Sequence, residues 1–348
     1  MSELYPSENK RKEIILERVS DLTKLHYARC EEYRKIVDNL GFNIEKFSSL
    51  EDTPYLPARA FKEYELKSIT EDEKFKTMKS SGTSGQNRSQ IILNKETASN
   101  QSKILTEITR EVLGSKRLPM LIIDTESTIK NRNNFTARTA GVLGFSMFGA
   151  KKLFALNDDL TVKVDEIINF IEENNDKPIF VFGFTFVVWK YFVKELMEKN
   201  IKLNIRNGVL IHGGGWKKIQ DESVSNNEFN ETVKDYVGVT RVANYYGMVE
   251  QTGSIYMECE NGFLHTTKYN DVVIRDEQTL EPLDSHETGL VQVISTIPES
   301  YPGHCILTED LGRQIGFDDC ECGRAGKYFT IYGRAEQSEV RGCSDTQE

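Results

Sequence analysis

The richest source of chemistry in this sequence is a run of small and hydroxylated residues. It reads Ser-Ser-Gly-Thr-Ser-Gly-Gln-Asn-Arg-Ser over positions 80–89 and leads into the apolar stretch Ile91-Ile92-Leu93. Such a loop presents many backbone N–H groups and hydroxyls to an anion, and its glycines let the backbone come close. It is not a Walker A loop, because no Gly-Lys-Ser/Thr follows. The run predicts a triphosphate-binding loop, with a plain flexible surface segment as the alternative. Its candidate binding residues are Ser80, Ser81, Gly82, Thr83, Ser84, Gly85 and Arg88.

A glycine-rich turn follows the apolar stretch from Val209 to His212. It consists of Gly213, Gly214 and Gly215 and continues into Trp216-Lys217-Lys218. Open sheets of parallel strands bind ligands at the carboxyl ends of the strands, where backbone amides and helix N-termini converge. The turn therefore predicts a second ligand-binding segment, with a tight turn and two solvated lysines as the alternative.

Two tyrosines stand close to an acidic residue in the segment 244–250. Tyr245 and Tyr246 offer aromatic surface on which a purine can stack, and Gly247 follows them. Glu250 fits Mg²⁺, because this ion prefers one or two carboxylates together with phosphate and water oxygens. The same pattern also occurs at the edge of an ordinary core.

Two further motifs supply one acidic and one basic residue. Asp310, in Thr308-Glu309-Asp310, can accept hydrogen bonds from both hydroxyls of a ribose. Arg334 follows Gly333, and its planar guanidinium suits a phosphate or a ribose. Each motif alone is a common surface arrangement, so the interpretation depends on the whole set.

Five of the six cysteines lie in the last third of the chain. Cys259 and His265 are six positions apart, and Cys320 and Cys322 enclose one residue. Four Cys and His ligands suit structural Zn²⁺. These four residues predict a zinc site, for which Cys305 is a substitute ligand; simple reduced thiols are the alternative.

Composition narrows the class of protein. The chain has 348 residues, 38% hydrophobic and 28% charged, as in an ordinary globular protein. Its net charge of −10 argues against a general binder of nucleic acid or anionic membranes. No stretch approaches the ~18 apolar residues of a membrane span, and the charged N-terminal sequence lacks the apolar region of a signal peptide. We therefore expect a cytoplasmic protein with reduced cysteines.

The hydrophobic pattern predicts an α/β protein. Residues 8–39 have helical periodicity, with Cys30 in the helix core, and residues 97–113 are again helical. Strands and helices alternate over 118–212, which favours a mostly parallel sheet with helices on both faces. The polar stretch 220–231 is interpreted as a loop or a frayed helix end. Short β-like runs after residue 252 indicate a β-rich subdomain. The expected parts are a helical region at 1–76, an α/β core at 77–252, the β-rich subdomain at 253–342 and a tail at 343–348.

Taken in order, these motifs resemble the adenylate-forming superfamily of acyl-CoA synthetases, firefly-type luciferases and peptide-synthetase adenylation domains. The resemblance covers roughly residues 77–343. Two details look like the LuxE-type acyl-protein synthetases, namely Ile211-His212-Gly213-Gly214-Gly215-Trp216-Lys217-Lys218 and the end at Arg341-Gly342-Cys343-Ser344. The fold implied is the large domain of adenylate-forming enzymes, with a β-rich C-terminal subdomain.

The resemblance also implies roles for individual residues on one bound ATP. The hydroxyl loop would wrap the β- and γ-phosphates, and Arg88 stands where relatives often carry a lysine. Gly213 to Gly215 and the two tyrosines would bracket adenine. Glu250 would hold Mg²⁺, Asp310 the ribose, and Arg334 the ribose or the α-phosphate. The aromatic run Phe180 to Phe186 would line an acyl channel, or it is ordinary core.

The end of the chain departs from the larger superfamily. Full-length relatives continue into a small mobile lid domain with a lysine that contacts the acyl carboxylate, whereas this sequence ends six residues after Gly342. The lid domain and its lysine are therefore expected to be absent. Lys217, Lys218 and His212 are the candidates, by position, for neutralising charge. Cys343 lies nine positions after Arg334, and an extended segment of that length reaches up to roughly 30 Å. Its thiolate would be a good nucleophile toward an acyl-adenylate, with an inert tail cysteine as the alternative.

The function predicted on this basis is that of an acyl-protein synthetase. ATP and Mg²⁺ would activate a carboxylic or fatty acid to acyl-AMP, a cysteine would take the acyl group as a thioester, and a reductase partner would receive it. A phenylacetate-type acyl- or aryl-CoA ligase is the nearest alternative. A non-catalytic nucleotide-binding scaffold is the alternative from another class.

Overall fold

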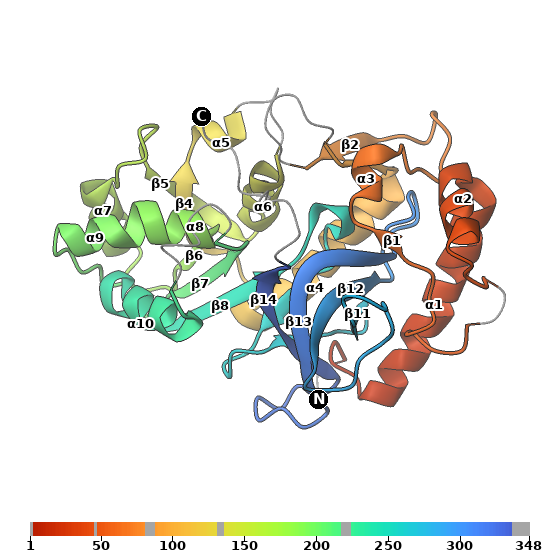
Figure 1. The fold of residues 1–348 in the computed structure, drawn as a ribbon. Coiled ribbons are helices and arrows are strands. Elements are labelled where there is room, and N and C mark those ends of the chain that lie inside the picture. The colour runs from red at the N-terminus through yellow and green to blue at the C-terminus, as the bar shows by residue number, and fades with distance from the viewer. Residues whose placement is uncertain (1–2, 45–46, 81–87, 131–135, 217–223, 336–348) are drawn as a thin grey trace. The chain divides into compact units, whose positions relative to one another are not determined.

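A computed structural model describes residues 3–44, 47–80, 88–130, 136–216 and 224–335. The chain forms two compact units (Figure 1). Of the described residues, the first unit combines those within 1–80, 85–108 and 247–339, and the second combines those within 109–246. The N-terminal region and the β-rich part, which the sequence pattern separates, thus belong to the same unit. Boundaries at residues 76, 252 and 342 stay a prediction.

The first unit contains an antiparallel sheet and the helices that pack on it. Its sheet has the order β11-β12-β13-β14-β10-β9, and the short strand β1 adds to β13 in parallel. A separate hairpin is formed by β2 and β3. The elements are α1 (Glu8–Arg29), α2 (Glu31–Asn39), β1 (Leu56–Pro57), α3 (Ala60–Glu63), β2 (Lys76–Lys79), β3 (Gln90–Leu93), α4 (Lys95–Leu113, ending in the second unit), η3 (Val249–Gln251), β9 (Tyr256–Glu258), β10 (Leu264–His265), β11 (Asn270–Arg275), β12 (Thr288–Ser295), β13 (Cys305–Phe317) and β14 (Lys327–Arg334).

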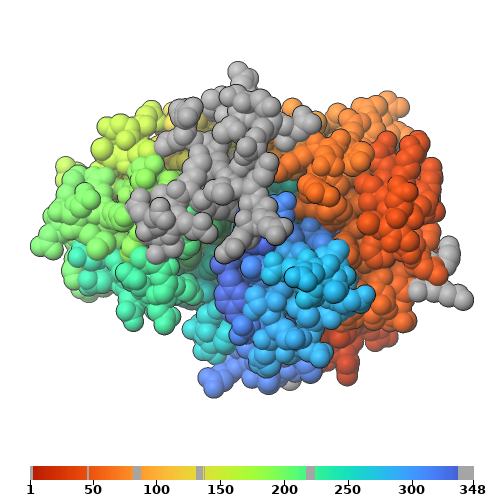
Figure 2. Space-filling view, viewed as in Figure 1, coloured from red at the N-terminus to blue at the C-terminus, as the bar shows by residue number. Residues whose placement is uncertain are grey.

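Helix α1 packs along this sheet (Figure 1). Ile15 and Val19 on one face of the helix are fully buried against Val273, Ile294 and Cys305 of three successive strands. The space-filling view shows the blue surface of the β-rich segment directly beside the red and orange surface of the N-terminal region (Figure 2). The apolar stripe of α1 therefore supplies part of the sheet's core, as expected for an amphipathic helix.

A buried charge network lies at the same interface. The Arg11 side chain is 0% exposed and contacts the Asp271 carboxylate at 2.5 Å as well as Glu8. Lys327, at the start of β14, reaches Asp271 at 3.1 Å. The pKa of the Asp271 carboxyl is held below its ordinary value, because the positive charges of Arg11 and Lys327 oppose the effect of burial. One helix and two strands thus meet at one carboxylate.

The second unit is a parallel sheet flanked by helices. Its strand order is β5-β4-β6-β7-β8, with every pair parallel. The elements are β4 (Leu118–Thr125), α5 (Ser127–Lys130), α6 (Ala137–Ser146), β5 (Gly149–Leu156), α7 (Val164–Glu173), β6 (Phe180–Phe184), α8 (Thr185–Val187), the π-helical turn η1 (Val188–Val193), α9 (Lys194–Glu198), β7 (Val209–Gly213), α10 (Asn226–Val237) and β8 (Arg241–Tyr246).

Helices cover both faces of the parallel sheet. Phe145 of α6 stacks on Phe182, with ring centroids 4.4 Å apart. The next strand residue is Gly183, and a Cβ atom added there would lie 2.7 Å from Val188, so η1 packs closely against this residue. Successive strand residues point to opposite faces, so α6 and η1 lie on opposite sides of the sheet. The expected parallel α/β architecture with an added β-rich part is confirmed.

The structure corrects three expectations about elements. The helix expected over 8–39 is broken at Cys30, which has an extended backbone (φ −120°, ψ 107°) and separates α1 from α2. Cys30 is buried, but at this junction rather than within a helix. The polar stretch 220–231 runs into a regular helix, α10, capped by Ser225 and ended by Gly238 with φ +78°.

None of the helices in the described part of the chain combines the length and hydropathy that a bilayer crossing requires.

Replacing Arg11 by Met tests the buried network. Among the described residues, Lys327 would then be the one cation left in contact with Asp271, so we expect a loss of about 3–5 kcal/mol in the free energy of unfolding. The control is Lys35→Met, because the Lys35–Glu31 pair is 64% and 61% exposed and such pairs contribute under about 1 kcal/mol. Denaturant unfolding of the full chain measures both. Equal losses for the two variants would show that burial of the network does not matter.

His26 predicts a loss of stability in mild acid. Burial lowers its pKa from 6.5 to about 3, and its ring binds Ser68 Oγ (2.7 Å) and the Pro298 carbonyl (3.0 Å). The unfolded chain therefore binds the extra proton first, so this contribution is complete above pH 6.5 and is lost toward pH 3. The slope from His26 is about 1.4 kcal/mol per pH unit. We expect a shallower pH dependence of the free energy of unfolding for His26→Gln than for the wild type, measured by denaturant unfolding at several pH values.

Candidate functional site

The base of the hydroxyl loop is a closed β-hairpin. Strands β2 and β3 pair from Lys76↔Leu93 to Lys79↔Gln90. Beyond them, Ser80 N–H donates to the Ser89 carbonyl (3.0 Å), and Ser89 N–H donates to Ser80 Oγ (2.9 Å). Ser80 is therefore buried in the base, where its hydroxyl oxygen accepts a backbone hydrogen bond. The remaining loop residues Ser81, Gly82, Thr83, Ser84 and Gly85 lie outside the described residues, and Arg88 is half-buried.

Asp310 and Arg334 are brought together by the sheet. They are directly opposite cross-strand partners on β13 and β14. Arg334 Nε lies 3.9 Å from Asp310 Oδ1, and Arg334 Nη1 lies 3.4 Å from Glu309 Oε2. Both side chains are only partly exposed. A carboxylate and a guanidinium thus stand side by side on this sheet, and their contacts with a ribose or a phosphate stay a prediction.

Glu250 lies on the short 3₁₀ turn η3 and is buried. Its backbone carbonyl accepts a 2.7 Å hydrogen bond from the Tyr301 hydroxyl. The next side chain, Gln251, donates to the Gly303 carbonyl at 2.8 Å. These contacts fix the turn against the loop that precedes β13. A carboxylate held in this way suits a divalent cation, which prefers hard oxygen ligands.

The glycine turn and the tyrosines belong to the second unit. Gly213 ends β7, and Tyr245 of β8 is its register partner. A Cβ atom at Gly213 would lie 2.3 Å from the Tyr245 ring, so only glycine lets that ring pack here. Tyr245 also packs near Phe145 and Phe182. Tyr246 is the next residue of the strand and points to the opposite face. The two rings therefore do not form one flat surface, and their contact with adenine stays a prediction.

His212 has the environment of a core residue. It is buried, its Nδ1 pairs with Thr185 Oγ1 at 2.8 Å, and its ring packs on Phe229 with centroids 4.5 Å apart. Burial lowers the pKa of His212 to about 3, so the imidazole is neutral at neutral pH. A neutral ring supplies no positive charge, which argues against His212 as the charge-neutralising group.

One polar pair at this sheet edge was not singled out by the sequence motifs. Arg138 of α6 binds the Asp124 carboxylate through two hydrogen bonds, both 2.7 Å, at the carboxyl end of β4. Thr128 Oγ1 donates to the same carboxylate at 2.6 Å. An acid at the end of an apolar strand was the available signal, but its partner lies fourteen positions away on a helix. The pair fixes α6 on the strand end.

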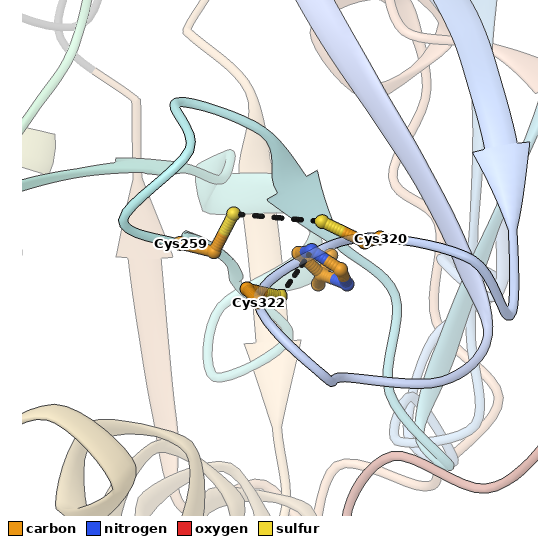
Figure 3. Close-up of side chains that lie close together, drawn as sticks. Cys259, Cys320 and Cys322 are labelled. Atoms are coloured by element: carbon orange, nitrogen blue, oxygen red, sulfur yellow. Dashed lines mark hydrogen bonds between the residues drawn. The ribbon is translucent and has the colours of Figure 1, made fainter.

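The predicted metal ligands Cys259, His265, Cys320 and Cys322 form a compact group in the first unit, here called the Cys/His cluster (Figure 3). One ligand atom from each residue lies within 4.8 Å of those of the others. Burial raises the pKa of Cys322 to about 12 and lowers that of His265 to about 3. Cys305, the suggested substitute ligand, instead packs with Ile15 and Val19 in the core beneath α1.

The aromatic run on β6 lies in the core of the second unit. Phe180, Phe182 and Phe184 are buried on β6, and Phe145 packs against the first two. An acyl channel at this run stays a prediction. Lys217, Lys218 and Cys343 lie outside the described residues, so their roles are predictions too.

Solved structures identify the fold. The chain superimposes on 2-hydroxyisobutyryl-CoA ligase in an open conformation, a structure determined with its acyl-AMP and CoA, with a TM-score of 0.75 and 14% sequence identity. The match covers 96% of this chain and 72% of the ligase. This likeness establishes the fold of adenylate-forming ligases, as the order of the motifs predicted.

Curated relatives point to one branch of that fold. A long-chain-fatty-acid–luciferin-component ligase of Aliivibrio fischeri is 24% identical over 328 residues, covering 87% of this chain and 80% of the relative. The ligase of the same description from Vibrio harveyi is 25% identical over 359 residues, covering 96% and 87%. The family model described as acyl-protein synthetase, LuxE, matches residues 2–348. The resemblance drawn from the motifs is confirmed, and the chain belongs to the LuxE acyl-protein synthetase family.

Proposed function

We propose that this protein activates a long-chain fatty acid with ATP and transfers the acyl group to its own Cys343. Membership of the LuxE family and the adenylate-forming ligase fold support acyl activation by a ligase. The observation that carries the proposal is the cross-strand pair Asp310–Arg334. The resemblance gives these two residues to the nucleotide, and they stand side by side although 24 positions separate them.

In the first step, a carboxylate oxygen of the fatty acid attacks the α-phosphorus of ATP. The bond between this phosphorus and the pyrophosphate oxygen breaks, and acyl-AMP and pyrophosphate result. Asp310 would accept hydrogen bonds from the ribose hydroxyls, and Arg334 would stabilise negative charge that develops on the α-phosphate. Fixed groups of this kind act mainly by positioning and by preorganised electrostatics.

Glu250 fits the role of magnesium ligand. Its carboxylate is buried, and η3 is held by the Tyr301 and Gln251 hydrogen bonds. Mg²⁺ bound there would neutralise charge on the phosphates. The protein's part is to hold this carboxylate in place. Val249 precedes Glu250 where adenylate-forming relatives usually carry a threonine, so no side-chain hydroxyl is available at that position.

In the second step, the Cys343 thiolate attacks the acyl carbonyl of acyl-AMP. A thioester forms, the anhydride bond to the phosphate breaks, and AMP leaves. A thiolate is the reactive form of cysteine, and thioesters keep the acyl group activated for a later transfer. A reductase that accepts the acyl group is the proposed partner. The curated relatives are named as ligases of long-chain fatty acids, and we propose this acid class here.

Two alternatives differ in what happens to the acyl group. A phenylacetate-type CoA ligase would use free CoA, in line with the CoA present in the structural relative. A nucleotide-binding scaffold would form no acyl-AMP at all. Pyrophosphate exchange separates the scaffold from both enzymes, and the acceptor thiol separates the two enzymes.

Glu250→Gln tests the first step. Removing the negative charge should weaken Mg²⁺ binding beside the phosphates, so we expect acid-dependent ATP–pyrophosphate exchange to fall about 100-fold and to need more Mg²⁺. The matched control is Glu277→Gln on an exposed turn, which should exchange at the wild-type rate. Exchange that is unchanged in Glu250→Gln excludes the magnesium role. Absence of exchange in the wild type with any fatty or aromatic acid favours the scaffold.

Cys343→Ala tests the second step. Intact-mass analysis after incubation with ATP, Mg²⁺ and a series of fatty acids should show one acyl adduct on the wild type and none on the variant, with pyrophosphate exchange retained. Cys30→Ala, at a buried cysteine between α1 and α2, should still be acylated. An adduct that persists on Cys343→Ala refutes this acceptor. In a parallel incubation with CoA added, acyl-CoA made equally by both proteins supports the CoA ligase.

A further inference from the structure

The Cys/His cluster combines two connections of the β-rich sheet. Cys259 immediately follows β9 and His265 ends β10, so both belong to one hairpin. Cys320 and Cys322 lie in the turn that joins β13 to β14. Figure 3 shows the three cysteine side chains pointing toward a common centre. The two connections lie about 60 positions apart in sequence and contribute two ligand atoms each.

The two cysteine segments have the same local structure. Cys259-Glu260-Asn261-Gly262 and Cys320-Glu321-Cys322-Gly323 are both four-residue turns. In each, the glycine N–H donates to the carbonyl of the first cysteine, at 3.1 Å and 2.9 Å. Both glycines have positive φ, +80° and +79°, a conformation that glycine adopts without strain. The backbone therefore holds the sulfur atoms in place through hydrogen bonds of its own.

Two of the distances between the ligand atoms are close to those around a tetrahedral metal. Cys259 Sγ lies 4.0 Å from Cys320 Sγ, and Cys322 Sγ lies 3.4 Å from His265 Nε2. Zinc bonds of about 2.3 Å to sulfur and about 2.0 Å to nitrogen give S···S near 3.8 Å and S···N near 3.6 Å at tetrahedral angles. We infer that Cys259, His265, Cys320 and Cys322 bind one structural Zn²⁺. This inference does not depend on acyl transfer.

The burial of His265 supports a ligand role. Its side chain is 0% exposed, and Nε2 faces a thiol, which is a weak hydrogen-bonding partner. Its Nδ1 is buried and makes no hydrogen bond to any residue within the described ranges. Burying an imidazole without strong partners costs free energy, and coordination of a metal would offset that cost.

The surroundings suit a closed structural site rather than a catalytic one. Phe263, Ile315 and Tyr328 pack around the cysteines. The Tyr328 ring stacks on His265 with an interplanar angle of 21°. Four protein ligands leave no open position for water or substrate. Arg324 N–H donates to Cys322 Sγ at 3.5 Å, the kind of outer hydrogen bond that orients a metal ligand.

Zn²⁺ at this position would connect the β9–β10 hairpin to the β13–β14 turn. Such a link closes a long loop in the unfolded chain and so favours the folded state. It would also fix the turn from which β14 starts toward Arg334. Loss of the metal should therefore lower the stability of the first unit.

Metal analysis of the full-length protein tests this inference. Protein expressed with zinc in the medium should contain about one zinc per chain by elemental mass spectrometry. Cobalt added to the metal-free protein should give the visible d–d bands and the thiolate charge-transfer band of a tetrahedral Co²⁺ site with three sulfur ligands. Cys259→Ser and Cys320→Ser should each lower the zinc content at least about fivefold and reduce the charge-transfer band.

Cys305→Ser is the matched control, because Cys305 is a buried cysteine of the same unit that lies outside the cluster. It should keep the zinc. Should the serine variants fail to fold, the cobalt titration of the wild type still decides the question. No metal uptake by the wild type, or a disulfide between Cys259 and Cys320 in its place, overturns the inference, as does a cobalt spectrum that Cys259→Ser leaves unchanged.

Discussion

The first unit depends on the ion pairs that the buried carboxylate of Asp271 forms with Arg11 and Lys327. Arg11 of α1 and Lys327 of β14 both contact it, although β11 and β14 are not neighbours in the sheet. The Tyr256 hydroxyl of β9 donates to the Asp271 carbonyl at 2.7 Å. The two ends of the strand order, β9 and β11, therefore meet, which requires the sheet to curl on itself. A buried carboxylate is tolerated only with close cations, so this closure needs the N-terminal helix.

This closure determines where the acidic and basic groups of the site can lie. The turn that carries Glu250 is bonded through Gln251 to Gly303, two residues before β13 begins. Asp310 follows on the same strand, and Arg334 is its partner on β14. The position of Glu250 is thus tied to the strand that carries Asp310 by a short path of hydrogen bonds from side chains to backbone carbonyls. Rigid elements hold such groups more accurately than free loops do.

The sequence predicts the fold class and the Cys/His cluster correctly, but it does not predict which way side chains face or how deeply they are buried. The alternation of strands and helices is visible as apolar periodicity, and the Cys/His cluster is visible as ligand types at short spacing. Whether Tyr245 and Tyr246 share a face depends on strand assignment, because neighbours on a strand point in opposite directions. The neutrality of His212 depends on burial by Phe229 of a distant helix. No glycine or proline stands beside Cys30 to mark the end of a helix. Periodicity alone therefore predicts one continuous helix across this position.

The β13–β14 hairpin shows why both of its ends need anchoring. Its pairing contains two irregularities, one that leaves Tyr332 unpaired on β14 and one that leaves Ile315 unpaired on β13. Each extra residue alone would shift the register by one and reverse the faces of all residues beyond it. Because the two lie on opposite strands, they cancel, and Asp310 meets Arg334. Ile315 packs against the Cys/His cluster, so the extra residue on β13 is fixed by the same group that we assign to zinc. The register that joins Asp310 to Arg334 is therefore determined partly at the far end of the hairpin.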